Sequence, residues 1–170
     1  MIIRTLLLLG LLSVGSQVWA IGIYQQPVDF IAKTFANHPP EPKALFLRGE
    51  TKKQVKDILG HRYSKLRIRY WLDGKRSVWV LDEIGKERPI TAGIVVNKQK
   101  IERIKVLIFR ESRGWEVRHD FFTEQFIDSA LNSRFNLDRQ IDGITGATLS
   151  VRAVTRLARV ALYLHSQILN

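Results

Sequence analysis

The middle of the chain alternates apolar and polar residues with the two-residue period of a β-strand. In residues 66–72, aliphatic residues and a tyrosine alternate with two arginines and a tryptophan, so that one face is mostly apolar and the other largely basic. Apolar-rich segments follow at 77–81, 90–96 and 101–109, with short turn sequences between them. Short connections between successive strands are typical of hairpins. The pattern therefore predicts an antiparallel meander of about four strands.

Apolar residues three and four positions apart predict helices on both sides of this meander. Two precede it, at 24–37 and 49–60, and the second ends at Gly60. Two follow it, at 119–131 and 149–168, and the last is the longest, with arginines opposite a broad apolar stripe. The order of elements predicts an α+β fold, an antiparallel β-meander flanked by N-terminal and C-terminal helices.

The first 20 residues have the layout of a secretory signal peptide. Arg4 precedes an apolar run at 6–14, and residues 18–20 (VWA) resemble a cleavage site. The alternative is an uncleaved membrane anchor. A spanning helix needs about 20 mostly apolar residues, however, and residues 15–17 (GSQ) interrupt this run. We therefore expect cleavage of residues 1–20 and a periplasmic product.

Composition narrows the chemistry that the chain can perform. The 170 residues include no cysteine, which excludes structural disulfides, thiolate metal sites, iron–sulfur clusters and thiol nucleophiles. Any redox chemistry must therefore come from an organic cofactor. The formal net charge is +11. For an exported chain, this charge favours contact with anionic membrane surfaces or acidic partner proteins, and we expect no nucleic-acid partner.

The segment before the last predicted helix is rich in glycine and hydroxyl residues. It reads Asp142-Gly143-Ile144-Thr145-Gly146-Ala147-Thr148-Leu149-Ser150. Unpaired N–H groups and the positive end of the helix dipole favour a phosphate at such a position, and the glycines allow close backbone approach. The alternative is an ordinary helix cap, with Thr148 or Ser150 as the capping residue. These general grounds leave both interpretations open.

The order of residues 142–148 closely resembles the D-x-x-(S/T)-G-A-(S/T) signature of the FMN-binding domain family. Relatives in that family include the flavin-bearing subunits of the sodium-pumping NADH:quinone reductase and of the Rnf complexes. The resemblance implies covalent FMN, joined by a flavin transferase through a phosphoester to Thr148. It also implies that the remaining cofactor-binding residues of this segment are Asp142, Gly143, Thr145, Gly146, Ala147, Leu149 and Ser150.

A second segment, directly after the fourth predicted strand, is similar to the E-(S/T)-x-G loop of that family. It consists of Glu111, Ser112, Arg113 and Gly114, with Arg113 in place of the usual proline. The resemblance implies that Glu111, Ser112 and Gly114 lie close to the flavin. Trp115 could stack on the flavin ring or could be a core or rim residue. The predicted domains are then a signal peptide at 1–20, an N-terminal helical segment at 21–60 and the FMN-binding domain at 61–170.

Other residues with chemical potential have simpler interpretations. The four histidines show no metal-ligand spacing, and we expect neither a metal site nor catalytic side chains. Trp71 and Trp79 are on adjacent predicted strands and are expected to pack as a cross-strand pair. Asp142 could stabilise its own turn, or could be recognised by the flavin transferase or bind that enzyme's metal.

The sequence thus predicts a periplasmic electron-transfer flavoprotein that carries FMN on Thr148. It would be a redox carrier or a subunit of an oxidoreductase rather than a stand-alone enzyme. Its expected partners are a flavin transferase and a membrane or periplasmic redox protein, with peripheral contact to an anionic membrane surface. Alternatives are a non-redox sensory module that binds FMN or another phosphorylated ligand, and an accessory protein of an envelope complex. A hydrolase is disfavoured because the sequence has no nucleophile-elbow motif.

Overall fold

A computed structural model describes residues 22–169 of the chain. The predicted signal peptide lies outside these residues. Within them, no helix combines the length and the apolar character that crossing a membrane requires.

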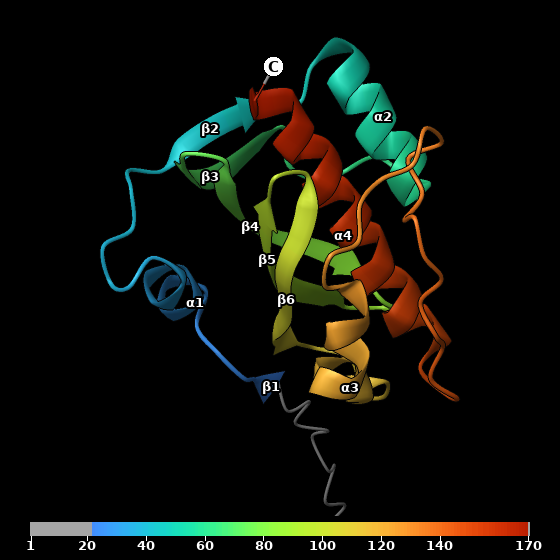
Figure 1. The fold of residues 1–170 in the computed structure, drawn as a ribbon. Helices are drawn as coiled ribbons and strands as arrows, with labels where there is room; N and C mark the ends of the chain where they lie inside the picture. The colour runs from blue at the N-terminus through green and yellow to red at the C-terminus, as the bar shows by residue number, and fades with distance from the viewer. Residues whose placement is uncertain (1–21, 170) are drawn as a thin grey trace, which may run out of the picture.

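The core of the fold is a six-stranded antiparallel sheet with the strand order β1-β6-β5-β4-β3-β2 (Figure 1). The four central strands are β3 (Arg67–Asp73), β4 (Arg76–Ile84), β5 (Pro89–Asn97) and β6 (Lys100–Phe109). They form the predicted meander, and the α+β class is confirmed. The sheet has six strands rather than about four, because β1 (Gly22–Ile23) pairs with β6 and β2 (Lys43–Phe46) pairs with β3.

Helices cover both faces of this sheet. On one face α4 (Thr148–Leu169) packs across the strands beside α2 (Gly49–Leu59), and both contribute to the larger hydrophobic cluster (Figure 1). On the other face α1 (Pro27–Thr34) packs against the sheet in a smaller cluster. A Cβ on Gly93 in β5 would lie 2.5 Å from the Phe30 ring, so this glycine allows α1 to approach the sheet closely.

Two predicted helices are shorter than expected. The segment 24–37 forms the eight residues of α1 only, and proline at its first position marks its start. The segment 119–131 does not form one helix. It holds α3 (Asp120–Thr123) and η2 (Glu124–Phe126), after η1 (Trp115–Arg118). The chain turns away after η2, where Asp128 has a φ of 63° and its N–H donates to the Ile101 carbonyl at 2.8 Å.

The expected pairing of Trp71 with Trp79 is wrong. The strand register places Tyr70 opposite Trp79, and their rings stack with centroids 5.1 Å apart. Trp71 lies opposite Val78 and packs on the α1 face, whereas Trp79 is buried under α4. Alternation of side chains along a strand therefore sends the two tryptophans to opposite faces of the sheet.

Candidate functional site

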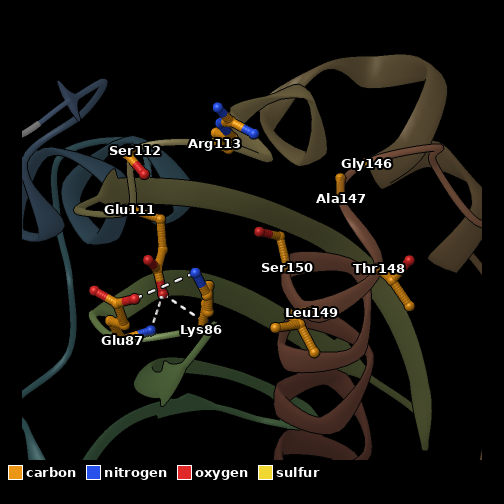
Figure 2. A pocket seen from close by; sticks show the side chains of 10 residues that line it. All are labelled: Lys86, Glu87, Glu111, Ser112, Arg113, Gly146, Ala147, Thr148, Leu149 and Ser150. Carbon is orange, nitrogen blue, oxygen red and sulfur yellow. Dashed lines mark hydrogen bonds and ion pairs between the residues drawn. The ribbon is translucent and has the colours of Figure 1, made fainter.

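Three segments that are far apart in the sequence line a pocket of about 600 Å³ (Figure 2). The β4–β5 loop contributes Lys86 and Glu87, and the segment after β6 contributes residues 111–113. The start of α4, with the residues just before it, contributes residues 146–150. Pockets for small molecules typically enclose about 300–1,000 Å³, so this one is large enough for a cofactor.

Glu111 holds the β4–β5 loop in place. One of its carboxylate oxygens, Oε1, accepts hydrogen bonds from the backbone N–H groups of Lys86 and Glu87, the latter at 2.7 Å (Figure 2). The same oxygen accepts a hydrogen bond from the Arg88 N–H at 2.9 Å. A Cβ on Gly85 would lie 2.8 Å from the same oxygen, so a glycine is needed for this approach. Hydrogen bonds to an ionised acceptor are stronger than neutral ones. Glu111 therefore fixes one wall of the pocket through the backbone of the loop.

Gly114 brings the segment after β6 into direct contact with the first turn of α4. Its φ of 85° lies in the left-handed region, which glycine adopts without strain. A Cβ at this position would lie 2.5 Å from the Ser150 Oγ and 3.4 Å from the Ala147 Cβ. The two segments that resemble family motifs thus pack against one another, and glycine is the residue that allows it.

Thr148 is the first residue of α4 and is exposed at the pocket. Ala147 precedes it as the buried N-cap residue, because the Ala147 carbonyl accepts the first helical hydrogen bond from the Val151 N–H at 2.9 Å. Neither Thr148 nor Ser150 is therefore the N-cap residue that the alternative interpretation required. The N–H groups of the first turn and the helix dipole are available to an anion at this position.

The two glycines of the segment before α4, Gly143 and Gly146, differ in backbone conformation. Gly146 has a φ of 81°, so the turn into α4 uses the left-handed conformation there. A Cβ on Gly143 or Gly146 would have no protein atom within 4 Å. Space next to the backbone is thus open at both positions.

The structure brings seven of the sequence-predicted residues to the pocket and leaves five outside its lining. The residues in the lining are Glu111, Ser112, Gly146, Ala147, Thr148, Leu149 and Ser150. The residues outside it are Asp142, Gly143, Thr145, Gly114 and Trp115. The Asp142 N–H donates to Gln125 Oε1 at 2.7 Å, which fixes the backbone of the turn.

Trp115 lies outside the pocket lining, where it packs with Arg118 and His119. Its side chain is 43% exposed. The Arg118 guanidinium lies 4.8 Å from its ring centroid, and the His119 ring packs edge-on at 5.4 Å. The position of Trp115 at the rim leaves its ring accessible, and stacking on a flavin stays a prediction.

Sequence reasoning missed Lys86, Glu87 and Arg113 as pocket residues. Residues 85–89 have the composition of a turn, but only the sheet order places this turn beside α4. Lys86 Nζ and Glu87 Oε1 form an exposed ion pair at 3.3 Å, and Arg113 is exposed at the pocket. The lining thus holds two cations and two carboxylates, and the Glu111 carboxylate is engaged by backbone N–H groups. No cluster of three or more His, Asp or Glu side chains that could hold a metal ion occurs within residues 22–169.

Comparison with known protein families identifies one domain in the chain. Residues 85–163 match the family model described as FMN-binding domain, which spans the pocket and most of α4. No curated protein and no solved structure gives a significant match.

Proposed function

We propose that this protein, whose residues 85–163 belong to the FMN-binding domain family, is a periplasmic electron-transfer flavoprotein with FMN covalently attached to Thr148. The family match supports flavin binding. The covalent link, the compartment and the electron transfer are our proposals.

The position of Thr148 is the observation that carries the proposal. Thr148 is exposed, is the first residue of α4, and lines a pocket that is large enough for a cofactor. A modifying enzyme can reach the Thr148 hydroxyl without unfolding the domain. A phosphate on Thr148 would lie at the helix N-terminus, where N–H groups and the helix dipole stabilise negative charge.

The covalent step forms one bond and breaks one. The Thr148 Oγ1 would bond to the flavin phosphorus while the bond between that phosphorus and the leaving group of an activated flavin phosphate donor breaks. The hydroxyl proton goes to solvent, and the leaving group departs with the electron pair. A flavin transferase would catalyse this transfer. The protein gains the mass of FMN minus water.

The surrounding residues suit a tethered phosphate. Lys86 and Arg113 can offset its charge, since both line the pocket and are exposed. Glu111 keeps the β4–β5 loop closed on the pocket, so that the position of Lys86 depends on the Glu111 carboxylate. The bound flavin would supply one- and two-electron chemistry that no side chain of this cysteine-free protein offers. A tether also retains the cofactor where free FMN would diffuse away.

Attachment can be tested on denaturing gels. The full chain is produced with and without a flavin transferase, and flavin fluorescence is recorded after electrophoresis. We expect fluorescence in the wild-type protein and in Thr148→Ser, which keeps a hydroxyl, and none in Thr148→Ala. Thr155→Ala is the matched control, because Thr155 lies further along α4 and its hydroxyl only bonds the Val151 carbonyl. Fluorescent Thr148→Ala protein would rule out Thr148 as the attachment site.

Electron transfer requires a separate experiment on the flavin-bearing protein. Dithionite reduces the flavin, and a cytochrome is then added while the flavin absorbance is followed. A carrier is expected to be reoxidised by an envelope cytochrome in the absence of oxygen. A flavin that stays reduced with every envelope redox protein offered would instead favour the sensory alternative.

A further inference from the structure

One segment of the chain carries most of its net positive charge. Residues 43–69 contain nine Lys and Arg against two Asp and Glu, a net charge of +7 out of +11 for the whole chain. They form β2, α2 and the beginning of β3 (Figure 1). We call this surface the basic face. Its cationic residues are Lys43, Arg48, Lys52, Lys53, Lys56, Arg62 and Lys65. Arg67 and Arg69 alternate with Ile68 on β3 and lie with Trp71 on the α1 side of the sheet.

A groove of about 350 Å³ lies on the basic face. Its five cationic lining residues are Lys52, Lys53, Lys56, Arg62 and Lys65. They come from two segments, because α2 provides the first three and the connection between α2 and β3 provides the others. Because five cationic side chains line the same groove, the groove is suited to binding an anion.

Most of this charge is uncompensated. Lys53 is shared between Glu50 at 3.4 Å and Asp57 at 4.0 Å, and Lys65 pairs with Asp82 at 2.6 Å. Among the ion pairs of residues 22–169, none includes Lys52, Lys56 or Arg62. Like charges held close together repel one another, and an anionic partner would relieve that repulsion.

The groove also has apolar walls and an exposed apolar rim. Leu47, Tyr63 and Leu66 line it between the cations. Leu66 is 60% exposed at the edge of the groove. The hydrogen bond from the Leu47 N–H to the Leu66 carbonyl, at 2.9 Å, holds the two segments side by side. A site for a soluble anion has no need of exposed apolar side chains, whereas a surface that enters the headgroup layer of a bilayer does.

We propose that the basic face docks on an anionic phospholipid surface, with the groove receiving a lipid phosphate and Leu66 entering the headgroup layer. Each Lys or Arg near an anionic bilayer strengthens binding several-fold, so a cluster of this size is sufficient for peripheral attachment. The flavin has no part in this inference. Only the choice of an envelope lipid rests on the proposed export.

The proposal also orients the molecule. Figure 1 shows α2 and β2 beside the C-terminal half of α4, while the FMN pocket lies at the N-terminus of that helix. With 22 residues, α4 is about 33 Å long. Docking by the basic face would therefore turn the pocket away from the lipid and toward soluble partners.

The test is vesicle binding of the full chain as purified from its host. Cosedimentation compares vesicles of phosphatidylcholine alone with vesicles in which about 30% of the lipid is anionic phosphatidylglycerol. The readout is the ratio of the two affinities, because a retained apolar N-terminus would contribute equally to both. We expect a ratio well above ten at low salt, and a steep fall as ionic strength rises.

Two triple variants make the test specific. Lys52→Gln, Lys56→Gln and Arg62→Gln together are expected to lower the affinity for anionic vesicles on the order of 100-fold. The control removes two lysines and one arginine from exposed positions on β6, as Lys100→Gln, Arg103→Gln and Lys105→Gln. We expect the loss of affinity for anionic vesicles in the control to be less than a third of the loss in the first triple variant. Circular dichroism checks that both variants are folded.

Three outcomes would overturn the proposal. The first is equal binding to neutral and anionic vesicles. The second is an equal loss in the two triple variants, which would reduce the effect to net charge. The third is evidence of a site for a soluble anion, given either by full displacement from vesicles with millimolar inorganic phosphate or by unchanged vesicle binding in Leu66→Ser.

Discussion

At the scale of single residues, the account depends on a carboxylate and two glycines that shape the pocket without being part of any reaction. Glu111 bonds three consecutive backbone N–H groups of the β4–β5 loop. Gly114 and Gly146 both have the left-handed conformation, but only Gly114 lies against other protein atoms. These differences lead to graded predictions.

Replacing Glu111 tests the clamp on the β4–β5 loop. We expect Glu111→Ala to lower the free energy of unfolding by about 1–3 kcal/mol, because three N–H groups lose a charged acceptor. Glu111→Gln keeps an acceptor oxygen and should lose roughly half as much. Urea unfolding measures both changes, and gel fluorescence measures flavin attachment, which should fall with Glu111→Ala. Wild-type stability in Glu111→Ala would show that the loop does not need the clamp.

The glycines give a series in which strain and crowding are separated. Gly143→Ala adds a methyl group in open space without a left-handed φ, so we expect a change within about 0.5 kcal/mol. Gly146→Ala adds strain alone, about 1–2 kcal/mol. Gly114→Ala adds strain and a contact of 2.5 Å with Ser150 Oγ, and should be the most destabilising. Thermal unfolding gives the order, and equal effects at Gly143 and Gly114 would contradict the packing described.

At the scale of elements, the seam between α4 and the sheet contains a buried polar network. The His165 Nδ1 lies 2.6 Å from the Ser77 Oγ, which also accepts a hydrogen bond from the Trp79 indole at 2.7 Å. His165 and Ser77 are fully buried, and His165 Nε2 has no partner within the described residues. Burial lowers the pKa of His165 from 6.5 to about 4, because the charged imidazolium is poorly solvated there.

This network predicts a loss of stability in mild acid. Between pH 6.5 and about 4 the unfolded chain binds a proton at His165 that the folded protein does not, so stability falls as the pH is lowered. From pH 8 to pH 5 the loss at this residue is about 2 kcal/mol. Urea unfolding should therefore show a weaker pH dependence in His165→Asn than in the wild-type protein.

A comparison of variants is needed because His61 has the opposite effect on the pH dependence of stability. The hydrogen bond to buried Glu83, at 2.8 Å, raises the pKa of His61. This interaction therefore stabilises the folded protein in acid, and the stabilisation is lost as the pH rises through the raised pKa. Should His165→Asn fail to fold, NMR titration of the wild-type protein replaces it. An imidazole of His165 that titrates near pH 6.5 would contradict the account.

At the scale of the whole molecule, residues 22–60 are integrated into the domain. β1 and β2 form the two edges of the sheet. The α2 side chains Val55, Ile58 and Leu59 are buried in the same cluster as the core of α4. The family match begins at residue 85, so these additions lie outside the matched region.

This integration predicts that the fragment 61–170 does not fold by itself. Removing α2 would expose the apolar face of α4 that it covers, and removing β2 would leave β3 as an unprotected edge. We expect the fragment to show no cooperative thermal transition by near-UV circular dichroism, whereas the full chain does. A fragment that melts cooperatively at the temperature of the full chain would make the segment 21–60 an independent addition.

Local patterns in the sequence predicted the elements that have a strong period of their own. The four central strands and α4 are examples, since their apolar stripes extend over seven or more residues. β1 and β2 have only two and four residues, and their pairing depends on partners far along the chain. The 119–131 segment has helical spacing at Phe122 and Phe126, but backbone bonds to Ile101 divert it, and no local pattern reports them.

The candidate site was likewise only partly predictable from the sequence. Residues 146–150 and 111–112 were found because they lie in two short motifs. The contact between Gly114 and Ser150, and the part taken by Lys86, depend on the order of strands in the sheet. Such contacts between distant segments carry no signal in one sequence.

The central claim, a flavin fastened to Thr148, is tested most directly by the mass of the intact protein from its native host. The account predicts a polypeptide heavier by FMN minus water, with the added mass on the peptide that contains Thr148 after proteolysis. A natural protein at the mass of its unmodified chain, or one with the flavin on another peptide, would contradict it.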